Sequence, residues 1–207
     1  MSAPELTETT IRYLFATSWL PADSGAQAVA VPGGSTIGVD TGGNLLHIAM
    51  WNLRGRGLMD FEQLRPVERE RVRVLGGEPF SGFRLVDAEA RMPGLEGALL
   101  DAARSTRTGD VRALVRALGL DNRGPWRTVV GRPFREAAAA GLVSVKGRLF
   151  KKTVIDDPAA VDSLLPRHDE LRAARGAYLD AEAELTGAVM TDCLQTVADA
   201  YAPSLGD

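Results

Sequence analysis

The chain has 207 residues, 45% of them hydrophobic, with a net charge of −3 at pH 7 and one cysteine. This length and composition are sufficient to bury one core, so we expect a single domain over residues 1–207. One cysteine excludes an internal disulfide, and with two histidines it leaves too few soft ligands for an ordinary zinc site. The start lacks a secretory signal pattern, and no stretch approaches the roughly 18 apolar residues that span a bilayer, so we expect a cytoplasmic location.

The first half of the chain is predicted to contain two helices separated by a loop. Residues 6–20 begin with a threonine- and glutamate-rich turn and then carry apolar residues at helical spacing. Residues 21–43 are rich in glycine and other small residues, which indicates a long loop with a short strand at 28–31. The second helix is predicted over 44–58 and ends at Gly55 and Gly57.

The middle of the chain alternates short strands and helices. Residues 69–75 alternate charged and apolar side chains, which fits either an edge strand or an exposed helix, and residues 83–88 predict a strand. Helices are predicted over 95–105 and 111–120, the second capped by Thr108 or by Asp110.

The last third is predicted to contain a β-hairpin between helices. Residues 125–141 predict a helix that Pro133 could break, since proline lacks a backbone donor. The hairpin spans about 142–155 and turns at Lys146-Gly147. Asp157 and Pro158 begin another helix, and a long amphipathic helix covers 178–201. The predicted fold class is therefore mainly α, a single helical domain with a protruding β-hairpin and minor strands. More than half of the ordered residues should be helical.

No sequence motif predicts catalysis, a metal or a cofactor. The glycine-rich run 32–43 lacks the Gly-Lys-Ser/Thr of a phosphate loop. We expect His47 to be a core or boundary residue and Cys193 to be a buried, inert thiol. Trp51 and Arg54 are expected to be structural, near the end of a buried helix. An alternative is an enzyme whose acidic residues lie close together in the folded chain without forming a motif in the sequence.

Charge gives the strongest functional signal. Residues 123–152 carry eight cations and one acidic residue, Glu136, so this segment has a net charge of +7 and the rest of the chain −10. An anionic partner would meet this local patch, although a solvated arginine-rich surface is the plainer interpretation. The cations are Arg123, Arg127, Arg132, Arg135, Lys146, Arg148, Lys151 and Lys152.

The predicted hairpin combines cations with apolar residues. Lysines beside an exposed Leu149-Phe150 pair are typical of a peripheral membrane contact, in which apolar side chains enter the interface and cations meet lipid head groups. The alternative is a winged-helix nucleic-acid-binding protein that uses the helix and hairpin of 126–155, but this helix is poor in base-reading side chains. The predicted membrane-contact residues are Lys146, Arg148, Leu149, Phe150, Lys151 and Lys152.

Three motifs in order resemble the Golgi phosphoprotein 3 family and its bacterial relatives. They are the Leu-Arg-Gly-Arg helix end within 51–61, the Pro-Gly start of a Leu-Leu-Asp helix within 92–104, and the segment 134–150 that leads into the hairpin. The matched core is assigned to 44–207, whereas 1–43 match poorly. The resemblance implies a mainly α-helical domain that lies on membranes, with the hairpin dipping into the bilayer.

The resemblance also implies a lipid head-group site. Eukaryotic members bind phosphatidylinositol 4-phosphate in a basic pocket. Arg127 matches one arginine of that pocket, Arg132 is the candidate to replace the second, and Arg54 is the further predicted head-group residue. Asn44 and Val130 stand where the family has arginines, so the specificity for that lipid does not carry over. The sequence thus predicts a cytoplasmic, peripherally membrane-associated protein that binds an anionic phospholipid surface, alone or as an adaptor for a protein client.

Overall fold

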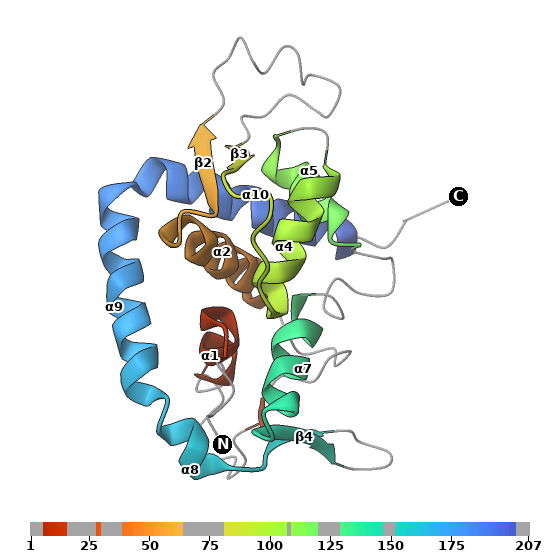
Figure 1. Cartoon of the computed structure of the whole chain (residues 1–207), viewed down its shortest axis with the longest axis vertical. Helices are drawn as coiled ribbons and strands as arrows, with labels where there is room; N and C mark the ends of the chain where they lie inside the picture. The colour runs from red at the N-terminus through yellow and green to blue at the C-terminus, as the bar shows by residue number, and fades with distance from the viewer. Residues whose placement is uncertain are drawn as a thin grey trace.

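The computed structural model confirms a mainly helical chain with minor strands (Figure 1). Helices account for 67% of the residues that the structure describes. The described residues are 6–15, 28–29, 39–63, 81–106, 109–119, 129–146 and 152–201.

The described helices alternate with two small antiparallel sheets along the chain. The helices are α1 (Glu8–Phe15), α2 (Val39–Gly55), α4 (Gly94–Ser105), α5 (Val111–Ala117), α7 (Gly131–Ala139), α8 (Pro158–Asp162), α9 (Leu165–Ala181) and α10 (Ala183–Tyr201). The strands are β1 (Ala28–Val29), β2 (Met59–Gln63), β3 (Ser81–Leu85), β4 (Val143–Lys146) and β5 (Lys152–Ile155).

Helix α2 lies at the centre of the fold and packs against α1, α4, α10 and β2 (Figure 1). Its apolar side chains Leu45, Leu46 and Met50 are almost completely buried. The contact with α10 is close because a side chain at Gly43 would collide with that of Leu194. The hydrophobic core therefore forms around one helix, and burial of its side chains supplies the main driving force for folding.

A buried carboxylate joins α10 to β3 and α5. Asp192 on α10 is 1% exposed. Its Oδ2 accepts hydrogen bonds of 2.6 Å from both the backbone N–H and the hydroxyl of Ser81, and its Oδ1 accepts one of 2.8 Å from Arg112 Nε. A buried carboxylate is tolerated when it is paired and hydrogen-bonded in this way.

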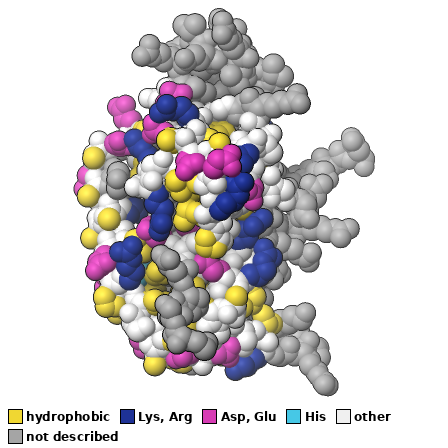
Figure 2. All heavy atoms as spheres, viewed as in Figure 1, with side chains coloured by type: hydrophobic (Ala, Val, Ile, Leu, Met, Phe, Trp, Pro, Cys, Tyr) yellow, Lys and Arg dark blue, Asp and Glu magenta, His cyan; other side chains and the backbone are white. Residues whose placement is uncertain are grey.

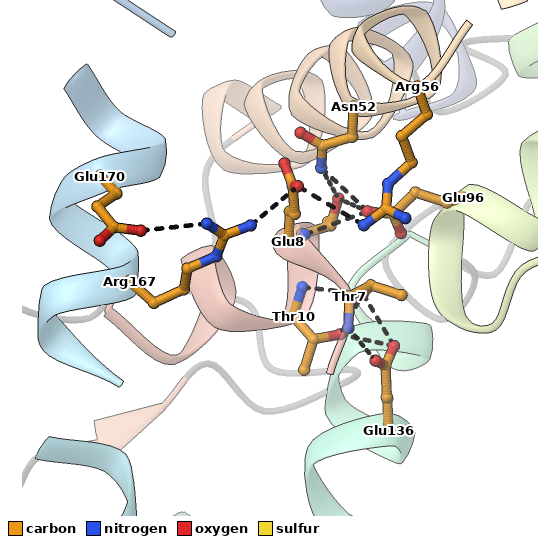
Figure 3. Close-up of polar contacts among 10 residues, drawn as sticks. Thr7, Glu8, Thr10, Asn52, Arg56, Glu96, Glu136, Arg167 and Glu170 are labelled. Atoms are coloured by element: carbon orange, nitrogen blue, oxygen red, sulfur yellow. Dashed lines mark hydrogen bonds and ion pairs between the residues drawn. The ribbon is translucent and has the colours of Figure 1, made fainter. Parts of the chain in front are cut away.

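Carboxylates from two other helices bind the start of α1 (Figure 3). Glu136 on α7 accepts from the Thr7 backbone N–H and from the hydroxyls of Thr7 and Thr10. The fully buried Glu96 on α4 accepts from the backbone N–H and hydroxyl of Thr9 and from Asn52 Nδ2 on α2. Burial raises the pKa of Glu96, while these hydrogen bonds act in the opposite direction. The two carboxylates fix α1 against α2, α4 and α7.

The predicted hairpin is confirmed, but Lys146, which was predicted at the turn, lies within β4. Strands β4 and β5 pair antiparallel, with Val143 opposite Ile155 and Lys146 opposite Lys152. Strand β1, which falls within the predicted strand at 28–31, adds to β5 and completes a three-stranded sheet. This sheet lies at the opposite end of the molecule from β2 and β3 (Figure 1).

Several predicted boundaries differ from the observed ones. Helix α2 begins at Val39, so the predicted loop ends earlier than residue 43. Helix α7 begins at Gly131, and Pro133 lies in its first turn, where a missing N–H costs no helical hydrogen bond, so the helix is not broken there. The predicted tail helix is divided between α9 and α10 at Glu182.

Other predictions concern capping and strands. The cap of α5 is Asp110, whose carboxylate accepts from the Arg112 N–H at 2.8 Å, and Asp157 caps α8 as predicted. Strand β2 was not predicted, although its partner β3 was. Residues 16–20 and 69–75 lie outside the described residues.

The Asp192 contacts lead to a stability prediction. Replacement of Asp192 by Asn removes the charge that faces Arg112 and leaves a buried amide in its place, so the free energy of unfolding should fall by about 2–4 kcal/mol. Urea denaturation measures the change. Asp199→Asn, an exposed position on the same helix, is the matched control and should change stability by less than about 0.5 kcal/mol. Equal effects of the two substitutions would contradict this role of Asp192.

Candidate functional site

The structure describes part of the predicted contact surface. Arg54, Arg132 and Lys146 lie within the described residues, as does the backbone of Lys152. The remaining predicted site residues lie outside them, namely Arg127, Arg148, Leu149, Phe150 and Lys151.

Arg54 lies at the C-terminal end of α2 and contacts acidic residues. Its guanidinium forms a bidentate ion pair with Glu182, lies 3.4 Å from Asp60 Oδ1 and stacks 5.3 Å from the centre of the Trp51 ring. Trp51 is only 5% exposed, which confirms its predicted structural position near the end of a buried helix. The charge of Arg54 is already compensated within the fold.

Arg132 comes from a different part of the fold. It lies on α7, which packs against α1, α4 and β4, whereas Arg54 contacts β2 and the junction between α9 and α10. The structure therefore does not gather Arg54 and Arg132 into one site.

The base of the hairpin exposes both charge and apolar surface. The Lys146 side chain is 63% exposed and its Nζ lies 3.0 Å from Asp156 Oδ1, while Val145 is 42% exposed. Hydrogen bonds from Ser144 and Lys146 lower the pKa of Asp156. Glu136, the single acidic residue of the basic segment, binds the start of α1 instead of these cations.

A second candidate site is a pocket between α1, α2 and α9 that the sequence did not reveal. Its volume is about 370 Å³. On the face shown in Figure 2, basic side chains lie over the region where α9 faces α1 and α2 in Figure 1. The charged residues of the lining are five arginines and two glutamates: Arg12, Arg56, Arg167, Arg172, Arg175, Glu8 and Glu170.

The two glutamates contact only two of these arginines. Glu8 Oε1 lies 3.7 Å from both Arg56 and Arg167, and Glu170 Oε2 lies 3.1 Å from Arg167 Nη1 (Figure 3). Within the described part of the chain, the other three arginines of the pocket form no ion pair with a carboxylate. These three, Arg12, Arg172 and Arg175, are called the arginine cluster below.

The two histidines of the chain contact the arginine cluster. Arg175 Nη2 donates to His47 Nδ1 at 3.2 Å, and Arg12 Nη1 donates to His168 Nε2. Arginine has no acceptor atom, so each of these ring nitrogens accepts and both imidazoles are neutral. A neutral imidazole orients a guanidinium without compensating its charge. On the other side of its ring, His168 Nδ1 lies 3.2 Å from Asp169 Oδ1, and this carboxylate contacts the histidine and not Arg12.

The electrostatic environment reflects the crowding of these cations. Burial and the nearby Arg172 lower the pKa of Arg12, and burial and Arg12 lower the pKa of Arg175. Burial and Arg175 also lower the pKa of His47 to about 4, against an opposing backbone contact with Thr186. The pocket thus contains mutually repelling positive charges in a partly desolvated environment.

Trp51 contributes an aromatic side chain to the lining of the pocket, and two buried donors of the lining residues have no hydrogen-bond partner. Trp51 stacks between His47, at 5.0 Å between ring centres, and Phe61, at 5.7 Å. Trp51 Nε1 and Arg175 Nε are buried and have no hydrogen-bond partner among the described residues. Most buried polar atoms have a partner, so these two donors are compatible with a bound acceptor.

Apart from this pocket, the described residues contain few groups that could take part in catalysis or metal binding. They contain no group of three or more His, Cys, Asp or Glu side chains arranged to hold a metal ion. Cys193 is fully buried, as predicted, and this burial raises the pKa of its thiol. No helix in this part of the chain is both long enough and apolar enough to cross a membrane.

Sequence reasoning missed the pocket because its residues come from three distant segments. A local signal does exist, since His168, Arg172 and Arg175 are spaced by four and three residues and so share one helical face. That spacing indicates a basic stripe on α9, but it does not reveal that α1 and α2 enclose the stripe.

Searches against family models, curated proteins and solved structures found no match to this chain. The resemblance to the Golgi phosphoprotein 3 family therefore remains a prediction from the sequence.

Burial of His47 leads to a pH-dependence prediction. Its folded pKa of about 4 lies below the ordinary 6.5, so the unfolded chain binds the extra proton and stability falls as the pH drops through this interval. The free energy of unfolding should lose about 2 kcal/mol from this group between pH 7 and pH 5. His47→Gln keeps an acceptor for Arg175 but cannot titrate, so its urea stability should depend less on pH. Parallel pH profiles of the two proteins would contradict this assignment.

Proposed function

We propose that the chain is a peripheral membrane protein that binds anionic lipid head groups through the basic segment 123–152 and its β4–β5 hairpin. The observation that carries the proposal is the position of the hairpin at one end of the molecule, with Lys146 and Val145 exposed on it (Figure 1). Exposed cations next to apolar side chains suit the interface between lipid head groups and acyl chains.

The charge balance of the segment supports this proposal. Its only acidic residue, Glu136, accepts hydrogen bonds from Thr7 and Thr10, and within the described residues it forms no ion pair with the exposed Arg135. An anionic membrane surface attracts cations that lie within a Debye length. The net positive charge of this segment would therefore act on the membrane even though the whole chain is acidic.

The helix that precedes the hairpin favours lipid over duplex DNA. A recognition helix needs exposed polar side chains that reach base edges. The sequence of α7 is GRPFREAAA, and its exposed residues are Arg135 and Ala139. Such a surface can meet phosphates but offers little to distinguish bases.

The proposal does not extend to one particular lipid. Arg54 is paired with Glu182 and Asp60, so the head-group site implied by the family resemblance would lack one of its free cations. Action as an adaptor for a protein client rests on that resemblance alone.

The first part of the test concerns the apolar pair of the predicted hairpin. Leu149→Ala/Phe150→Ala removes surface whose burial in the interface would contribute roughly 2–5 kcal/mol. Sedimentation with vesicles of graded anionic content should show weaker binding at every salt concentration, because loss of apolar area is insensitive to screening.

The second arm concerns charge. Lys151→Ala/Lys152→Ala should weaken vesicle binding mainly at low salt, by about 1 kcal/mol for each lysine. Arg116→Gln, at an exposed position on α5, is a matched control for the loss of positive charge and should have little effect. Unchanged vesicle binding by both double variants would reject the proposal. Loss of duplex-DNA binding with the lysine pair alone would instead support the nucleic-acid alternative.

A further inference from the structure

We infer that the pocket between α1, α2 and α9 is a separate anion-binding site that takes the phosphoryl group of an organic phosphate monoester. The inference does not depend on the proposed membrane function, because the hairpin contributes no residue to this pocket. None of the residues to which the resemblance assigns the head-group site lines it either.

The charge of the arginine cluster indicates the charge of the ligand. Arg12, Arg172 and Arg175 have no carboxylate partner within the described residues, and the lining as a whole carries three more positive than negative charges. A phosphate monoester carries about −1.5 to −2 charges at pH 7, together with several strong acceptor oxygens. It matches three guanidiniums better than a carboxylate with a single charge, and arginine binds phosphate in bidentate geometry.

The way in which the cluster is held distinguishes it from ordinary surface arginines. Arg12 and Arg175 each donate to the ring nitrogen of a neutral histidine, and both histidines are buried. This fixes the side chains, while no carboxylate of the described residues forms an ion pair with them. Elsewhere in the fold, Arg54 and Arg112 are held by carboxylates instead. An anion bound between the arginines would relieve their mutual repulsion.

Two buried donors without a hydrogen-bond partner indicate that the ligand of the pocket carries acceptor atoms. Trp51 is 95% buried, and its Nε1 has no hydrogen-bond partner among the described residues. The Nε of Arg175 is likewise buried and without a partner. Both residues line the pocket, so these unsatisfied donors belong to side chains beside the space that a ligand would fill.

The apolar part of the lining indicates an organic group attached to the phosphate. Ile48, Trp51 and Leu171 line the pocket beside the arginines. A volume of about 370 Å³ lies within the usual range for small-molecule sites. Inorganic phosphate would leave this apolar wall uncovered, whereas an aromatic or aliphatic substituent would pack against it.

The test compares phenyl phosphate with inorganic phosphate by isothermal titration calorimetry at pH 7.5. Phenyl phosphate should bind with a stoichiometry of one and at least about tenfold more tightly than inorganic phosphate, because its ring buries apolar surface. Arg172→Gln is the most informative variant, since Arg172 is exposed and forms no hydrogen bond or ion pair with the described residues. It should weaken phenyl phosphate binding by about tenfold or more.

Control variants separate site-specific loss from a general change of charge. Arg172→Lys, which keeps the charge, should recover part of the affinity, and Arg116→Gln on α5 should change it by less than about twofold. The inference is overturned if the unaltered protein does not bind phenyl phosphate, or if Arg172→Gln and Arg116→Gln have equal effects.

A vesicle experiment identifies the source of the phosphate group. If the pocket accepts a lipid head group, Arg172→Gln should also weaken binding to vesicles that contain phosphatidic acid, which is a phosphate monoester. If its ligand is soluble, only phenyl phosphate binding changes. Because Lys151→Ala/Lys152→Ala leaves the pocket intact, loss of vesicle binding with normal phenyl phosphate binding would concern the hairpin alone.

Discussion

The start of α1 is held between carboxylates from two other helices, and the arrangement of the pocket depends on this contact. A helix of eight residues is only marginally stable by itself, and its first turn has backbone donors without helical partners. Glu136 and Glu96 accept from this turn, and the Glu136 carboxylate places negative charge at the positive end of the helix. With α1 fixed in this way, Glu8 faces Arg56 and Arg167, and Arg12 faces His168.

The arginines described here have two roles, and the role depends on whether the contacting side chain is a carboxylate or a histidine. Carboxylates compensate Arg54 and Arg112, so these residues connect elements of the fold and have little charge left for a ligand. Arg12 and Arg175 are instead oriented by neutral histidines and keep their charge. Such a site has lower stability than one neutralised by acids, since like charges are held together in a partly desolvated pocket. Natural proteins often accept this kind of cost at functional sites.

Sequence reasoning succeeded where the determining signal is local. The hairpin at 142–155, the cap at Asp157 and the end of α2 at Gly55 each follow from neighbouring residues. It failed where distant segments decide the structure. The division of the tail at Glu182 coincides with an ion pair to Arg54, 128 residues away. The arginine cluster was missed for the same reason, since Arg12 joins Arg172 and Arg175 only after α1 and α9 have packed.

The arginine cluster has no ion-pair partner among the described carboxylates, and a phosphate monoester would complete it. A crystal structure of the protein grown with phenyl phosphate tests both parts directly. The account predicts that the phosphoryl oxygens lie within hydrogen-bonding distance of Arg12, Arg172 and Arg175, with the phenyl ring against Trp51. An empty pocket in which these arginines form ion pairs with carboxylates of the chain would contradict it.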